Sequence, residues 1–123
     1  MVTQYQRGAD FERRVQKDMA SHGYLAHRTP GSKTPVDVYS FKHGDEWVFI
    51  QCKTGGSLGP EEWNKFLDFC ELWDATPIMA EKAKRGIKYH LLTGRKDGTG
   101  KRQPMADWEP SGKTGGENGQ EAR

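Results

Sequence analysis

Three polar side chains fall at one end of a β-hairpin that the sequence predicts. The segments Val36–Phe41 and Trp47–Lys53 are rich in β-branched and aromatic residues, and a short glycine-containing stretch joins them. If the hairpin is symmetric about this turn, Asp37 faces Gln51 across the two strands, and opposed residues share one face of a sheet with Cβ atoms about 5 Å apart. Lys53 falls on the same face because side chains alternate along a strand. The pattern gathers a carboxylate, an amide and an ammonium group.

These three groups suit a metal-assisted reaction on a phosphate. Mg²⁺ takes oxygen ligands and usually keeps waters and phosphate oxygens in its shell. Lys53 is placed to orient a water or to neutralise charge that develops on the phosphate. The alternative is a half-exposed hairpin with ordinary polar residues at its open end, and a one-residue change of register would separate the three side chains.

Two further residues are candidates for the same site. Glu12 follows Phe11, at the edge of the apolar stripe of a predicted helix, where a solvated glutamate is the alternative interpretation. Ser32 lies in a loop bounded by proline and glycine, shortly before Asp37. A hydroxyl on such a loop could reach the site, although by itself Ser32 is an ordinary loop serine.

The elements that must position these residues follow the order α-β-β-β-α-β-β, which defines an α/β fold. Phe11, Val15 and Met19 recur at helical spacing, and Pro60 before two glutamates is typical of a helix start. The predicted helices are 8–22 and 60–74, and the predicted strands are 24–29, 36–41, 47–53, 76–80 and 87–92.

The last thirty residues differ in composition from the rest of the chain. Only four apolar residues follow position 93, whereas seven of the 15 glycines do. A segment with so little to bury cannot offset its ordering entropy. We therefore expect one domain over residues 1–93 and a disordered C-terminal tail over residues 94–123.

Bulk composition narrows the classes of protein without identifying one. The net charge is only +2, and the mean hydropathy of −0.93 with no long apolar run predicts no membrane helix. The N-terminus has no apolar segment of the secretory type, and Cys52 and Cys70 lack metal-ligand spacing. We expect reduced thiols and a cytoplasmic location, in the host cytoplasm if a phage encodes the protein.

Basic residues cluster locally despite the low net charge, and local basic surfaces bind phosphates. The alternative is a set of solvated charges. The predicted DNA contacts are Arg7, Arg13, Arg14, Arg28, Lys33, Lys82, Lys84 and Arg85.

Taken together, these motifs resemble a known family. Glu12, the run Arg28–Ser32, Val36–Val38 and Ile50–Lys53 are similar to the archaeal-type Holliday junction resolvases. These belong to the restriction-endonuclease-like, PD-(D/E)xK nuclease superfamily, whose signature is an Asp followed by Glu or Gln, any residue, and Lys. The resemblance covers about residues 7–92 and implies a mixed central β-sheet flanked by helices.

The resemblance also implies roles for individual residues. Asp37, Gln51 and Glu12 would hold Mg²⁺ (or Mn²⁺ as a substitute), Lys53 would be the catalytic lysine, and Ser32 would be the loop serine implicated in cleavage. The implied function is a metal-dependent, structure-specific DNA endonuclease of recombination and repair, cutting four-way junctions as a homodimer. The alternatives are a related nuclease acting on linear, flapped or modified DNA and a non-catalytic DNA-binding module.

One position departs from the family pattern. Most resolvases of this type would have Glu where this chain has Gln51. An amide oxygen still coordinates Mg²⁺ but brings no charge. Metal binding is therefore expected to depend more on Glu12 and on the phosphate of the substrate.

Overall fold

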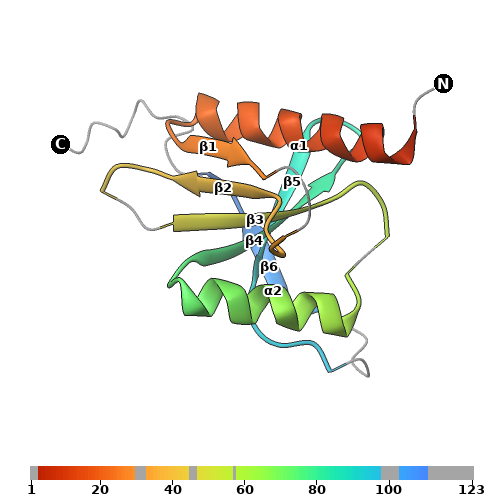
Figure 1. The fold of residues 1–123 in the computed structure, drawn as a ribbon, viewed down its shortest axis with the longest axis vertical. Helices are drawn as coiled ribbons and strands as arrows, with labels where there is room; N and C mark the ends of the chain where they lie inside the picture. The colour runs from red at the N-terminus through yellow and green to blue at the C-terminus, as the bar shows by residue number, and fades with distance from the viewer. Residues whose placement is uncertain (1–2, 30–32, 45–46, 57, 98–102, 111–123) are drawn as a thin grey trace.

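A six-stranded β-sheet lies between two helices in this protein. The computed structural model describes residues 3–29, 33–44, 47–56, 58–97 and 103–110. Figure 1 shows α1 along one side of the sheet and α2 along the other. The elements are α1 (Gln4–Ser21), β1 (Leu25–Arg28), β2 (Val38–Phe41), β3 (Trp47–Lys53), α2 (Pro60–Leu72), β4 (Thr76–Lys82), β5 (Ile87–Leu92) and β6 (Met105–Trp108).

The first helix begins earlier than its apolar spacing predicts. Thr3 accepts a hydrogen bond from the backbone of Gln6 at 3.0 Å, and the Gln6 side chain accepts one from the Thr3 backbone at 2.9 Å. This capping box satisfies two backbone donors that the first turn leaves unpaired. Among the described residues, no helix is long and apolar enough to span a bilayer.

The strands follow their sequence order across the sheet, from β1 to β6. Neighbouring strands are antiparallel except for β3 and β4, which are parallel and are connected through α2. The predicted hairpin register is confirmed, with Tyr39 opposite Phe49 and Phe41 opposite Trp47. The expected mixed sheet with flanking helices is therefore present.

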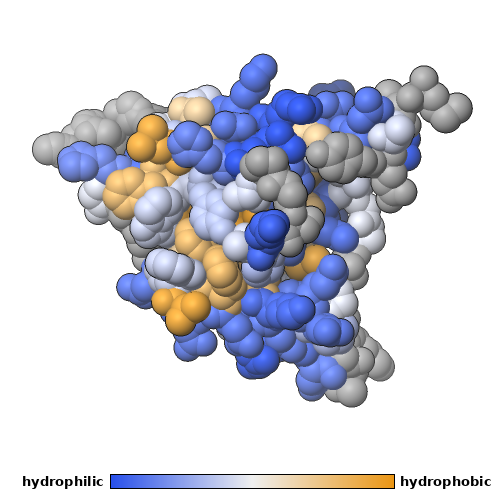
Figure 2. Space-filling view, in the orientation of Figure 1, coloured by the Kyte–Doolittle hydropathy of each residue, from blue (hydrophilic) through white to orange (hydrophobic). Residues whose placement is uncertain are grey.

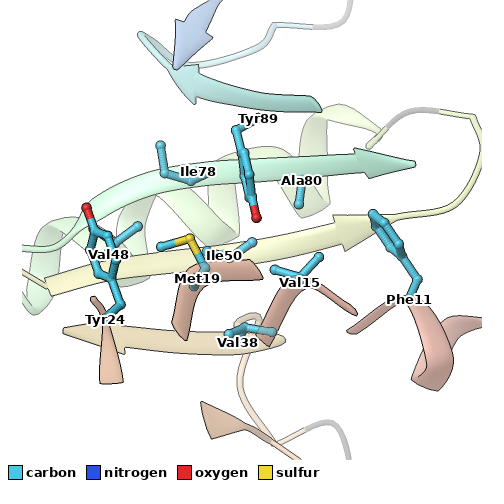
Figure 3. Close-up of a cluster of buried hydrophobic side chains, with 10 residues drawn as sticks. All are labelled: Phe11, Val15, Met19, Tyr24, Val38, Val48, Ile50, Ile78, Ala80 and Tyr89. Atoms are coloured by element: carbon cyan, nitrogen blue, oxygen red, sulfur yellow. The ribbon is translucent and has the colours of Figure 1, made fainter. Parts of the chain in front are cut away.

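Each face of the sheet carries its own hydrophobic cluster. On the α1 side, Phe11, Val15 and Met19 pack against the sheet as their spacing predicted, and Figure 3 shows them over the side chains of the central strands. On the α2 side, Trp63 and Phe66 are both 0% exposed. Helices thus cover the middle of the sheet on both faces, whereas the hairpin is only partly covered, with Tyr39 and Gln51 partly buried and Trp47 45% exposed. The sheet residues of the α1 cluster are Val38, Val48, Ile50, Ile78, Ala80 and Tyr89.

The chain beyond residue 93 contributes to the fold, contrary to the expected boundary. The indole nitrogen of Trp63 donates to the Gly94 carbonyl at 2.8 Å, and β6 pairs with β5. The Trp108 ring lies edge-on to Tyr89, with ring centroids 5.8 Å apart. The prediction of a disordered tail is therefore wrong for residues 94–97 and 103–110. This segment has few apolar residues, but Trp108 and the backbone pairing of β6 with the edge of β5 anchor it to the sheet. Residues 98–102 and 111–123 lie outside the described part.

Candidate active site

Asp37 is fixed at the entrance to β2 by backbone contacts. Its N–H donates to the Ile50 carbonyl at 2.8 Å, which continues the hairpin ladder by one step. Its carboxylate Oδ2 accepts a hydrogen bond from the Cys52 backbone N–H, also at 2.8 Å. The carboxylate is therefore held against β3, beside the positions that the hairpin register predicted.

Gln51 and Lys53 lie on β3 at the same end of the sheet as Asp37. The Gln51 side-chain amide donates from Nε2 to the Pro35 carbonyl at 3.1 Å. Lys53, partly buried, makes no hydrogen bond or ion pair with another residue in the described ranges, and it lowers the pKa of Asp37 electrostatically. The fold therefore brings Asp37, Gln51 and Lys53 together, as the strand alternation predicted.

Glu12 approaches this site from α1 and is paired with an arginine. Arg28 Nε donates to Glu12 Oε1 at 3.1 Å, and each side chain is only 20% exposed. Both groups act electrostatically on Asp37, since Glu12 raises its pKa and Arg28 lowers it. Arg28 was predicted as a DNA contact, but in this structure its nearest anionic partner is Glu12.

Burial dominates the electrostatics of Asp37. Removal from water raises the pKa of its carboxyl group to about 6; the Cys52 N–H opposes this shift, Glu12 adds to it, and the Lys53 and Arg28 charges lower the value. Because burial makes ionisation of Asp37 unfavourable, a cation bound beside its carboxylate would stabilise the ionised form. The burial of Asp37 and its proximity to a second carboxylate therefore fit a divalent cation.

The donor set also fits a hard metal ion rather than a soft one. Asp37, Glu12 and the amide oxygen of Gln51 offer only oxygen atoms. The described ranges contain no group of three or more His, Cys, Asp or Glu residues that could hold a metal by themselves. Two carboxylates and an amide leave coordination positions for water and phosphate, which is the usual way in which Mg²⁺ is bound.

A cleft of ≈ 630 Å³ lies in front of Asp37 and Gln51. One wall is the segment before β2, which Figure 1 shows descending in front of the sheet towards α2. The other wall is a face of α2 that the sequence analysis did not predict. Its side chains are spaced so that they share one helix face beside the buried residues, and this spacing is the signal in the sequence that indicates them. They are Glu62, Lys65, Asp68, Phe69 and Leu72.

The predicted basic residues occupy two regions of the surface. Lys33 lines the cleft beside Asp37. Arg14 and Lys17 on α1 share a shallow hollow with Gly86 and Ile87, so α1 lies beside the β4–β5 turn. Arg7, Lys82, Lys84 and Arg85 are exposed, Arg13 is paired with Asp10 at 3.0 Å, and Arg14 lies over the Phe11 ring at 5.7 Å. Ser32 lies outside the described residues.

The two cysteines are free thiols, as expected. Burial raises the pKa of Cys70 to about 12 and that of Cys52 well above its usual value, so both remain protonated at neutral pH. Neither thiol is therefore poised as a nucleophile.

Comparison with solved structures identifies a similar fold. A structure titled as the 1.6 Å resolution structure of Archaeoglobus fulgidus Hjc, a Holliday junction resolvase from an archaeal hyperthermophile, has a TM-score of 0.59 to this chain. The two share 23% sequence identity, and the similarity covers 68% of this chain and 70% of that one. The mixed six-stranded sheet with its two flanking helices is thus the expected restriction-endonuclease-like α/β fold.

The family follows from the sequence itself. Residues 3–100 match the model of the archaeal Holliday junction resolvase (Hjc) family. This match spans most of the chain, and the protein belongs to that family. No curated protein sequence gave a match.

Proposed function

We propose that this protein is a metal-dependent endonuclease that resolves four-way DNA junctions. The observation that carries the proposal is the convergence of Asp37, Gln51 and Lys53 at one end of β3, in a chain that belongs to a junction-resolvase family. Roles in DNA recombination and repair and a cytoplasmic location are part of the proposal.

Asp37, Glu12 and the Gln51 amide oxygen would hold the Mg²⁺, with Mn²⁺ as a substitute. The bound ion would supply an activated water and would polarise the scissile phosphate. Asp37 would be the central ligand, since the Cys52 N–H holds Oδ2 of its carboxylate and no other described residue donates a hydrogen bond to Oδ1. Glu12 contributes negative charge, and its pairing with Arg28 sets its position.

Lys53 would act on the phosphate rather than on the metal. Its ammonium group lies close enough to lower the pKa of Asp37, and it forms no ion pair within the described residues. A cation in this position stabilises negative charge that develops on the phosphate oxygens during hydrolysis. We assign Ser32 a role in cleavage from the family resemblance alone.

The DNA arms would contact the two basic regions described above. Lys33 would lie beside the scissile phosphate, since it lines the cleft with Asp37. The second region lies where α1 meets the β4–β5 turn, and its exposed basic side chains would contact backbone phosphates farther along the duplex. Its members are Arg7, Arg13, Arg14, Lys82, Lys84 and Arg85; Arg28 would contact DNA only by leaving Glu12.

Cutting two opposed strands of a junction requires two copies of this single site, so we propose a homodimer. An exposed apolar surface at the end of the sheet away from Asp37 is the candidate interface, and Figure 2 shows hydrophobic residues gathered near the C-terminal end of α2 and the start of β3. We call it the apolar patch: Leu25, Phe41, Trp47 and Trp73, of which Leu25, Trp47 and Trp73 are 45–68% exposed.

The test is cleavage of a synthetic four-way junction by the purified full-length protein, with and without Mg²⁺. We expect paired nicks that require the metal. Intact junctions together with cut linear or flapped DNA would favour the related-nuclease alternative. Tight junction binding with no metal-dependent cutting of any substrate would favour the non-catalytic DNA-binding module.

A further inference from the structure

The segment before Asp37 is tied to the sheet by side-chain hydrogen bonds. The hydroxyl groups of Thr34 and Tyr39 lie 2.8 Å apart, and Thr34 Oγ1 also accepts the Val36 backbone N–H at 3.3 Å. One residue farther along, the Pro35 carbonyl accepts from Gln51 Nε2 at 3.1 Å. Two strands of the hairpin therefore each supply one side chain that holds residues 33–36.

Tyr39 is itself held rigidly. Its ring packs edge-on against Phe49, the residue directly opposite on β3, with ring centroids 4.8 Å apart. Phe49 is only 4% exposed because it lies in the cluster under α2. The packed ring thus fixes the position of the Tyr39 hydroxyl, to which the Thr34 hydroxyl is hydrogen-bonded.

The held segment leads directly into the catalytic end of the sheet. Thr34 and Pro35 line the cleft together with Asp37 and Gln51. On its other side, Thr29 Oγ1 donates to the Val36 carbonyl at 2.7 Å. Holding this wall still keeps the Asp37 carboxylate in one position, and a site held within fractions of an ångström reacts faster than a loose one.

We propose that Thr34, Tyr39 and the amide nitrogen of Gln51 form a clamp that positions residues 33–36 against the metal site. The proposal rests on the proposed nuclease function and adds positioning residues to it. It also explains the glutamine at position 51. A glutamate there would keep an oxygen for the metal but would turn an acceptor towards the Pro35 carbonyl, which needs a donor.

The first test replaces Tyr39 with phenylalanine, which removes the hydroxyl and keeps the ring on Phe49. We expect the single-turnover rate of junction cleavage at saturating Mg²⁺ to fall about 3- to 10-fold, because a net hydrogen-bond contribution is about 1 kcal/mol. Junction affinity measured without metal should stay unchanged. Amide hydrogen exchange at Val36 should become faster, while exchange at Ile50 in the strand centre should not.

Tyr89→Phe is the matched control. Tyr89 donates a hydrogen bond of the same length, 2.8 Å, to Asp18 on the α1 side of the sheet. Its loss should lower thermal stability without changing the cleavage rate or the exchange at Val36. If Tyr39→Phe leaves both the rate and the exchange at the control level, the clamp proposal is overturned.

Two more variants separate the clamp from general destabilisation. Thr34→Val and Tyr39→Phe break the same contact, so their combined effect should be smaller than the sum of the two; full additivity would contradict the clamp. Gln51→Glu should accelerate exchange at Val36, and unchanged exchange there would remove Gln51 from the clamp. The exchange measurements need no substrate, so they judge the clamp even if the wild-type protein leaves four-way junctions intact and the proposed function fails.

Discussion

At the residue scale, the site is dominated by one carboxyl group kept partly from water. The Asp37 carboxylate accepts the Cys52 backbone N–H, lies near the charge of Glu12, and has a pKa raised to about 6, chiefly by burial. Between about pH 4 and pH 6 the folded protein therefore holds this proton more tightly than the unfolded chain does. When no cation is bound, stability is therefore lost as the pH rises from about 4 to about 6, and the full loss is present above that range.

Replacing Asp37 with asparagine should abolish cleavage and stabilise the metal-free protein. Asparagine can still accept the Cys52 N–H but carries no charge to desolvate. We expect the free energy of unfolding at pH 7.5 to rise by about 1 to 3 kcal/mol. The gain should shrink as the pH falls towards 4, where the wild-type carboxyl group is protonated in both states. Urea unfolding at several pH values measures this, and equal stability of the two proteins at pH 7.5 would contradict the assigned electrostatics.

The same carboxyl group predicts a pH dependence of metal use. Protons and Mg²⁺ compete for Asp37, so the Mg²⁺ concentration that gives half-maximal cleavage should rise as the pH falls below about 6. The rise should approach tenfold per pH unit. The measurement is a Mg²⁺ titration of the cleavage rate from pH 5 to pH 8, with circular dichroism to show that the protein stays folded. A half-maximal concentration that is constant from pH 5 to pH 7.5 would rule out Asp37 as the central ligand.

At the scale of the elements, β6 completes the sheet from a segment of low apolar content. The strand covers the edge of β5, and residues 94–97 are pinned to α2 on the way. The Asn64 side chain exchanges two hydrogen bonds with the Lys96 backbone, both at 2.8 Å. Backbone pairing and a few side-chain hydrogen bonds therefore hold β6 and residues 94–97 in place, whereas α1 is held by its apolar face.

Trp108→Ala should destabilise the fold through this strand. The partly buried indole loses its edge-on contact with Tyr89, and we expect a cost of about 1 to 3 kcal/mol in the free energy of unfolding. Asp107→Ala on the same strand is the control, since Asp107 is 89% exposed and its 4.0 Å contact with Lys88 lies in solvent. Chemical denaturation compares the two, and equal effects would show that β6 is held by its backbone alone.

At the scale of the whole molecule, the candidate site and the apolar patch lie at opposite ends of the central strands. Gln51 and Lys53 are at the end of β3, whereas Trp47 begins it. A row of ring contacts links the patch to α2, from Phe41 to Trp47 at 5.0 Å and from Phe69 to Trp73 at 6.4 Å. Two copies joined through this surface would keep both clefts open to DNA.

The double substitution Trp47→Lys with Leu25→Lys should produce a folded monomer. Both side chains are substantially exposed, at 45% and 68%, so the monomer fold tolerates the change. Light scattering should show half the wild-type mass, and the paired nicks at a junction should become independent single nicks. Ala20→Lys adds the same charge to an exposed position on α1 and should remain dimeric. A double variant that still dimerises would place the interface elsewhere.

Much of the site could be predicted from the sequence because its signals are local. Alternation along two short strands and a glycine turn set the register that brings Asp37 opposite Gln51 and Lys53 beside them. The helical spacing of Phe11, Val15 and Met19 likewise places α1 over the sheet. These patterns repeat within a few residues, so a short stretch of chain is sufficient to show them.

The tertiary structure alone decided which distant side chains meet at that site. Glu12 and Arg28 pair across 16 positions, and the Gln51 amide reaches Pro35 across 16 more. The α2 wall of the cleft and the pairing of β6 with β5 depend in the same way on how whole elements pack. No periodic pattern in the sequence predicts such contacts. Each contact joins residues far apart in the chain, and they come together only when the elements that carry them pack against one another.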